Sequence, residues 1–162
     1  MFGIFTNKKT KQPDNMADNI AKTLFSQITS ARDEAKKAGL ITENIFNDRL
    51  NHMFVAGYLI GYVDSCLIDL PDINNKKEHS KAIFEKMFPG SGFDFVRAKL
   101  VARQQASTIS EESEKYIQVK ANAYAFDQGM ELAQEEVEKQ RADGSSQPVG
   151  LKEFLLLGEV NG

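Results

Sequence analysis

The segment that most constrains the fold runs from Met53 to Val63 and carries no charged side chain. A helix that crosses a membrane needs about 20 predominantly apolar residues. This run ends after 11 residues, because Asp64 follows it and Asp69 and Pro71 come soon after. Its length therefore excludes a transmembrane segment. A helix that is apolar on most of its surface is typical of a protein interior, so the sequence predicts a buried helix here.

Apolar residues recur at helical spacing along most of the chain, and patterns typical of strands are scarce. We predict an all-α protein, an irregular bundle of about five helices with a buried central helix over residues 43–70 and a long C-terminal helix over residues 109–142. The C-terminal helix has the clearest pattern, a coiled-coil-like seam of apolar residues that alternate steps of three and four: Tyr116, Val119, Ala123, Phe126, Met130, Ala133 and Val137.

The chain divides into three predicted parts. Residues 1–13 form a flexible N-terminal segment, residues 14–142 a single helical domain, and residues 143–162 a linker followed by an apolar tail. Charge also changes along the chain. Residues 71–107 carry seven basic and four acidic side chains, whereas residues 108–142 carry four basic and eight acidic ones. Such a pattern weakly favours antiparallel pairing of neighbouring helices, since exposed ion pairs contribute little.

Composition limits the classes of partner and compartment. The net charge of −3 argues against nucleic acid as a partner, because phosphate binding needs a concentrated positive field. Cys66 is the only cysteine, so the chain has no internal disulfide, and a reducing cytoplasm is the expected location. We therefore expect a cytoplasmic protein that binds neither nucleic acid nor a membrane interior.

Small residues line one narrow face of the central helix at Gly57, Gly61 and Ser65. A glycine inside a helix costs about 1 kcal/mol relative to alanine, so two of them indicate a compensating close contact. The contact could be a crossing within the chain, for example with Gly129 of the C-terminal helix, a homodimer crossing, or space for a ligand. We favour the crossing within the chain.

Polar groups on the same helix suggest a pocket. Tyr58 and Tyr62 lie one turn apart, and buried tyrosine hydroxyls need hydrogen-bond partners. Asp64 continues an apolar stripe, where a carboxylate would be costly if it were buried without a partner. Tyr124 of the C-terminal helix could complete a ligand pocket with these three. The alternative for Asp64 is that the helix emerges into solvent at this point, and we favour that alternative.

Catalytic and metal-binding patterns are absent. His52 and His79 are the only histidines, and neither belongs to the Glu-x-x-His motif of di-iron bundles. Cys66 has no cysteine or histidine nearby in the sequence that would indicate a zinc site. We therefore predict no metal, no cofactor and no catalytic residue.

The two ends of the chain carry apolar residues. Phe2, Ile4 and Phe5 precede three lysines, an order that suits weak peripheral contact with a membrane through residues 1–12. The C-terminal tail either folds back on the bundle or docks on another chain, and its apolar residues are Leu151, Phe154, Leu155, Leu156 and Leu157.

These features favour a non-enzymatic interaction or scaffold protein that associates with itself as a homodimer or with another protein. The second hypothesis is a helical bundle that binds a small ligand, or an enzyme of a kind that the motifs do not reveal, with its pocket near Tyr58, Tyr62 and Asp64. The weaker third hypothesis is a peripheral membrane protein.

Overall fold

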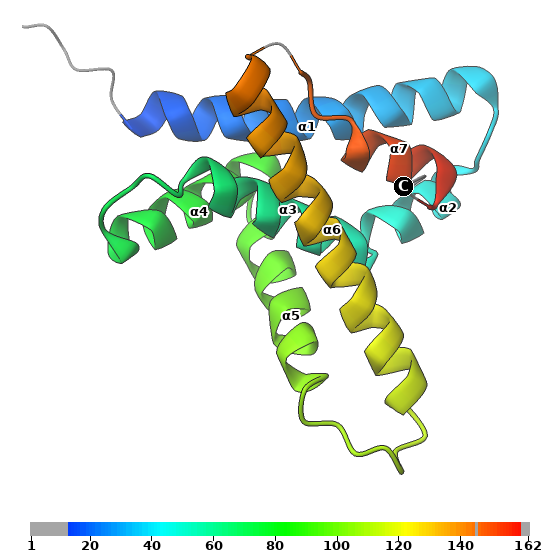
Figure 1. Ribbon diagram of the computed structural model, residues 1–162. Helices are drawn as coiled ribbons and strands as arrows, with labels where there is room; N and C mark the ends of the chain where they lie inside the picture. The colour runs from blue at the N-terminus through cyan, green and yellow to red at the C-terminus, as the bar shows by residue number, and fades with distance from the viewer. Residues whose placement is uncertain (1–12, 145, 160–162) are drawn as a thin grey trace, which may run out of the picture.

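The computed structural model describes residues 13–144 and 146–159, and within these ranges helices joined by turns and loops are the only regular secondary structure (Figure 1). The all-α prediction is confirmed. Seven helices follow one another along the described chain: α1 (Pro13–Ala38), α2 (Glu43–Leu50), α3 (Met53–Cys66), α4 (Ile73–Met87), α5 (Gly92–Gln105), α6 (Tyr116–Asp143) and α7 (Gly150–Leu157). The N-terminal segment proposed for membrane contact, residues 1–12, lies outside the described residues.

The expected central helix over residues 43–70 is two helices, because the chain turns at Asn51 and His52. Thr42 begins α2, where its side chain accepts a hydrogen bond from the backbone N–H of Ile45. His52 then begins α3 from an extended backbone conformation, and its Nδ1 accepts from the N–H of Phe54. Two separate N-caps within one apolar pattern explain part of the difference between about five and seven helices. The other part is the tail, which forms α7.

Helix α3 is the centre of the structure. Every residue from Met53 to Val63 is buried, as expected for a helix that is apolar all round. Helix α6 crosses it over the greatest length, and α1, α4 and α5 also pack against it. In Figure 1, α3 lies behind the middle of α6.

Glycines allow the backbones of α3 and α6 to touch. A Cβ atom on Gly57 would lie 1.9 Å from the carbonyl oxygen of Phe126, and one on Gly129 would lie 2.1 Å from the carbonyl oxygen of Phe54. A Cβ on Gly61 would lie 2.6 Å from the carbonyl oxygen of Met130. The small face of α3 therefore meets α6 of the same chain, which is the first of the three alternatives considered above.

The apolar seam of α6 is used within the chain along its C-terminal two thirds. Ala123, Phe126, Ala133 and Val137 are buried, whereas Tyr116 and Val119 near the start of the helix are only partly covered. The contacts between α3 and α6 progress toward higher residue numbers on both helices, from Gly57 beside Phe126 to Ser65 beside Arg141. The two helices therefore run in the same general direction. This leaves little of the seam for a coiled coil with another chain.

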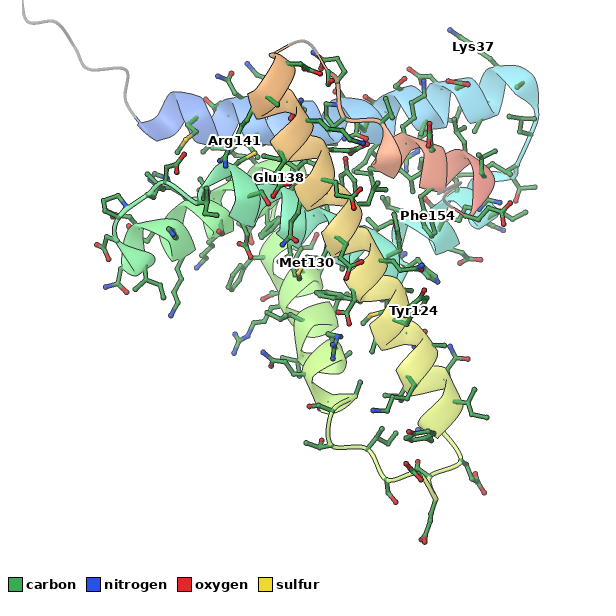
Figure 2. All side chains as sticks on the ribbon, in the orientation of Figure 1. Lys37, Tyr124, Met130, Glu138, Arg141 and Phe154 are labelled. Atoms are coloured by element: carbon green, nitrogen blue, oxygen red, sulfur yellow. The ribbon has the colours of Figure 1, made fainter. Side chains whose placement is uncertain are left out.

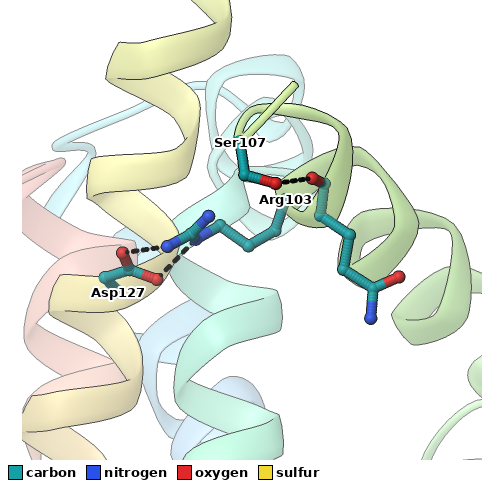
Figure 3. A network of polar contacts seen from close by, with 4 residues as sticks. Arg103, Ser107 and Asp127 are labelled. Carbon is teal, nitrogen blue, oxygen red and sulfur yellow. Dashed lines mark hydrogen bonds and ion pairs between the residues drawn. The ribbon is translucent and has the colours of Figure 1, made fainter. Parts of the chain in front are cut away.

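Helix α5 and the first turns of α6 form an antiparallel arm that projects from the rest of the molecule (Figure 1). The guanidinium group of Arg103 donates two hydrogen bonds to the carboxylate of Asp127, at 2.7 and 2.8 Å (Figure 3). A bidentate pair of this kind fixes orientation as well as distance. It holds the last turn of α5 against α6.

Replacing Gly57 with alanine should lower the free energy of unfolding by about 1–3 kcal/mol, because the new Cβ would overlap a backbone carbonyl that cannot rotate away. Helix propensity alone would change stability by about 1 kcal/mol in the opposite direction. Urea unfolding followed by circular dichroism measures the change. Ser30→Ala, at an exposed position of α1, is the control and should not destabilise the protein. A Gly57→Ala variant as stable as the wild type would contradict the crossing.

Candidate functional site

A groove of about 790 Å³ opens between α3, α4 and α5. Its floor is apolar, and the side chains that line it include Ile60, Phe84, Phe93, Val96 and Leu100. Phe84 and Val96 are buried at 5% and 4% exposure, whereas Phe93 and Leu100 are only partly covered. No described residue of the chain fills this groove, so apolar surface remains open to solvent.

Helical spacing brings the lining residues to one place. On α4, Ile73, Lys77, Lys81 and Phe84 lie three or four residues apart and therefore share one face. On α5, Phe93, Val96, Arg97 and Leu100 follow the same rule. Each helix thus presents a stripe that combines apolar and basic residues.

The rim of the groove is basic. Lys76, Lys77, Lys81 and Arg97 line it together with Asp64 and Glu78, which leaves a net charge of +2. Lys76 donates to the backbone carbonyl of Ile68 at 3.2 Å, and the ammonium of Lys81 lies 5.4 Å from the centre of the Phe93 ring. Lys77 and Arg97 form no ion pair with any other described residue. The rim can therefore attract an anionic group at little cost to the fold.

Asp64 lies at this groove, but it is not a buried acid. Its side chain is exposed, and it forms no hydrogen bond or ion pair with the described residues. Neighbouring helices desolvate the carboxyl group enough to raise its pKa, while the charge of Lys76 lowers it. The helix emerges into solvent here, as the favoured alternative for Asp64 expects.

Tyr58 and Tyr62 face away from the groove, toward α6. The Tyr58 hydroxyl donates to the carboxylate of Glu136, and that of Tyr62 donates to the amide oxygen of Gln140 at 3.1 Å. Burial raises the pKa of both groups, to about 12 for Tyr62 and further for Tyr58, where the negative charge of Glu136 adds to the effect. Both hydroxyls therefore stay protonated near neutral pH and act as hydrogen-bond donors rather than as acids or bases.

Tyr124 does not join the other three candidates. Its side chain is 66% exposed on the outer face of α6, where its hydroxyl accepts from the amide of Gln128 at 3.1 Å (Figure 2). The pocket expected around Tyr58, Tyr62, Asp64 and Tyr124 is thus not assembled in the structure. Asp64 alone lines the groove.

A network of polar groups joins the tail to the bundle. Glu136 accepts from the Tyr58 hydroxyl and, through Oε1, from the backbone N–H groups of Val149 and Gly150 at 3.1 and 2.8 Å. Gln27, buried in α1, donates to the Tyr58 hydroxyl and accepts from the N–H of Lys152, each at 3.3 Å. Four helices, α1, α3, α6 and α7, therefore share one cluster of hydrogen bonds.

The apolar tail folds back as helix α7. Leu151, Phe154 and Leu155 are buried, Leu156 is partly covered and Leu157 is exposed. Arg49 of α2 donates to the carbonyl oxygens of Leu155 and Leu156 at the end of α7. Of the two alternatives for the tail, the structure has the one in which it packs on its own chain, and Leu151, Phe154 and Leu155 belong to the same core as the other helices.

Other reactive groups do not form a site. Cys66 is half-buried, and burial raises the pKa of its thiol to about 11, so it is a poor nucleophile near neutral pH. Across residues 13–144 and 146–159, no three His, Cys, Asp or Glu side chains gather as metal ligands would. None of the helices in those ranges has both the length and the apolar character needed to cross a membrane.

No protein-family model, curated protein sequence or solved structure matches this chain. The functional inference therefore depends on the geometry of the groove.

Sequence reasoning missed the groove because its residues come from three separate segments. The usable signal was the presence of basic and apolar residues on one face of α4 and of α5, such as Lys77 and Lys81 between Ile73 and Phe84. Glu136 and Gln27 could not be singled out, since nothing in their local sequence shows that they meet Tyr58.

Replacing Tyr58 with phenylalanine should lower the free energy of unfolding by about 1–2 kcal/mol, because Glu136 and Gln27 each lose a partner at a buried site. Tyr124→Phe is the matched control and should change stability by less than about 0.5 kcal/mol, because its hydroxyl bonds only to Gln128 on an exposed face. Chemical denaturation compares the two variants. Equal effects would contradict a structural role for the network.

His52 should make stability fall as the pH drops below neutrality. Desolvation, and then the charge of Lys99, lower its pKa below the ordinary value of 6.5, and its Nδ1 must stay unprotonated to accept from Phe54. The unfolded chain takes up a proton near 6.5 and the folded chain only at lower pH. The stabilising contribution of neutral His52 is therefore fully present above pH 6.5 and is lost as the pH falls toward the lowered pKa.

The free energy of unfolding measured between about pH 7.5 and 5 tests this dependence. His52→Asn keeps an N-cap acceptor without a titrating ring, so its stability should decline less over the same interval. Identical pH dependence in the two proteins would mean that His52 does not cause the loss.

Proposed function

We propose that this protein is a non-enzymatic interaction protein that binds an acidic, amphipathic segment of a protein partner in the groove between α3, α4 and α5. The observation that carries the proposal is the combination of an apolar floor with a basic rim on one open surface. Helices commonly bind in such grooves through apolar anchors three and four residues apart. Acidic residues on either side of those anchors would face Lys77 and Arg97.

The apolar and the charged residues of the groove would have different roles in binding such a partner. Burial of apolar surface on Phe93 and Leu100 would provide most of the affinity, at about 25 cal/mol per Å² before the costs of association. The rim charges would mainly select the partner and speed its approach, as charges at the edge of interfaces do. Binding should accordingly weaken as salt is added.

Several features support an interaction role over catalysis. The hydroxyls of Tyr58 and Tyr62 and the thiol of Cys66 keep their protons near neutral pH, and each serves packing or hydrogen bonding. We also propose that the protein self-associates and that it works in the cytoplasm, where its one cysteine stays reduced. Weak membrane contact through residues 1–12 remains a separate proposal.

A synthetic peptide tests the groove. A helical peptide with leucines on one face and glutamates beside them should bind, and the same peptide with lysines in place of glutamates should bind about tenfold or more weakly. Lys77→Glu combined with Arg97→Glu should reverse this preference, because both changes lie on the rim. Isothermal titration calorimetry measures the affinities, and NMR shifts at Ile60 and Leu100 locate the bound peptide.

Lys37→Glu combined with Lys139→Glu is the matched control, since it changes charge equally at exposed positions outside the groove (Lys37 is labelled in Figure 2). This variant should bind like the wild type. Equal binding of both peptides would contradict the proposal. Binding of dodecanoate without binding of either peptide would assign the groove to small amphiphilic anions instead.

A further inference from the structure

The arm formed by α5 and the start of α6 has little core of its own. Among residues 101–124, only Ala106 and Ala123 are buried. The remaining side chains along this part of the arm are exposed or only partly covered, and Figure 1 shows the arm standing away from the other helices. Structure of this kind is stabilised when another surface covers it.

The tip of the arm, residues 107–117, is both acidic and apolar. Ile117 is 82% exposed, the highest value among the exposed large hydrophobic residues of the described chain. Glu111, Glu112 and Glu114 are exposed and form no ion pair with the described residues, and with Lys115 they give the tip a net charge of −2. The tip therefore has the chemistry that the groove, with its net charge of +2, would bind.

The tip cannot occupy the groove of its own chain. The groove lies at the N-terminal end of α5, which we call the root of the arm, and is lined there by Phe93, Val96 and Arg97. The tip follows the C-terminal end of that helix. A helix of 14 residues is about 21 Å long and does not fold on itself. A tip in the groove must consequently come from another molecule.

We infer that a second copy of this chain supplies the occupant, and that two copies exchange tips reciprocally. The inference rests on the proposed function, because it names the partner of the same groove. Two arms that run antiparallel along α5 bring each tip to the root of the other arm. Both contacts are then identical and related by a twofold axis, so the assembly closes at two chains. Arg97, Val101 and Gln104 lie on the exposed face of α5 that would meet the second copy.

Two charge-reversed versions of the full chain test the exchange. The groove variant carries Lys77→Glu and Arg97→Glu, and the tip variant carries Glu112→Lys and Glu114→Lys, all at exposed positions. Like charges then face each other in either homodimer, so the dissociation constant should rise about tenfold or more for each variant. In an equal mixture every groove meets a tip of opposite charge, and dimers should form again. Sedimentation equilibrium over a concentration series measures all three samples.

Circular dichroism establishes that both variants are folded as the wild type is, and the variant Lys37→Glu with Lys139→Glu should dimerise normally. Dimers that form in the mixture but in neither variant by itself would support the exchange. Assemblies larger than two chains, or a mixture that stays monomeric, would overturn it. A monomeric wild type that still binds the acidic peptide would overturn the second copy as occupant and leave the proposed groove intact. A wild type that neither dimerises nor binds the peptide would overturn both the exchange and the proposed function.

Discussion

The rest of the structure depends on the contact between the backbones of α3 and α6. Gly57 meets the carbonyl of Phe126, and Gly129 meets that of Phe54, so neither helix could carry a larger residue at these positions without moving apart. This close approach places the tyrosines of α3 within hydrogen-bond distance of Glu136 and Gln140. It also fixes the position of α6 relative to α3, and hence the direction in which the arm formed by α5 and the start of α6 projects from the other helices.

The polar cluster around Glu136 extends the effect of that crossing to the end of the chain. A helix as short as α7 is marginal in isolation. Here a carboxylate lies at its N-terminus and the guanidinium of Arg49 at its C-terminus, which matches the direction of the helix dipole at both ends. With α1, α6 and α7 covering much of the body, the groove beside α4 and α5 remains as open apolar surface.

Sequence alone indicated the helical class, the burial of Met53 to Val63 and the unusual role of the glycines, because these are local patterns with one physical cause. It did not reveal the break at His52, since an apolar pattern continues across it and only the cap geometry marks the boundary. It grouped Tyr58 with Asp64, although six positions along a helix place the two side chains on different faces, Tyr58 toward Glu136 and Asp64 toward solvent. The groove and the Glu136 cluster depend on tertiary contacts that no single segment encodes.

The parallel crossing of α3 and α6 has a consequence for synthesis. Tyr58 and Glu136 are 78 residues apart in the sequence, and α4 and α5 must be made before α6 appears. A growing chain therefore displays its most apolar helix to water while α4, α5 and the loop before α6 are made, and apolar surface exposed in this way is prone to aggregate. Nascent-chain chaperones should meet this protein through Met53 to Val63, and release should follow the emergence of α6 from the ribosome.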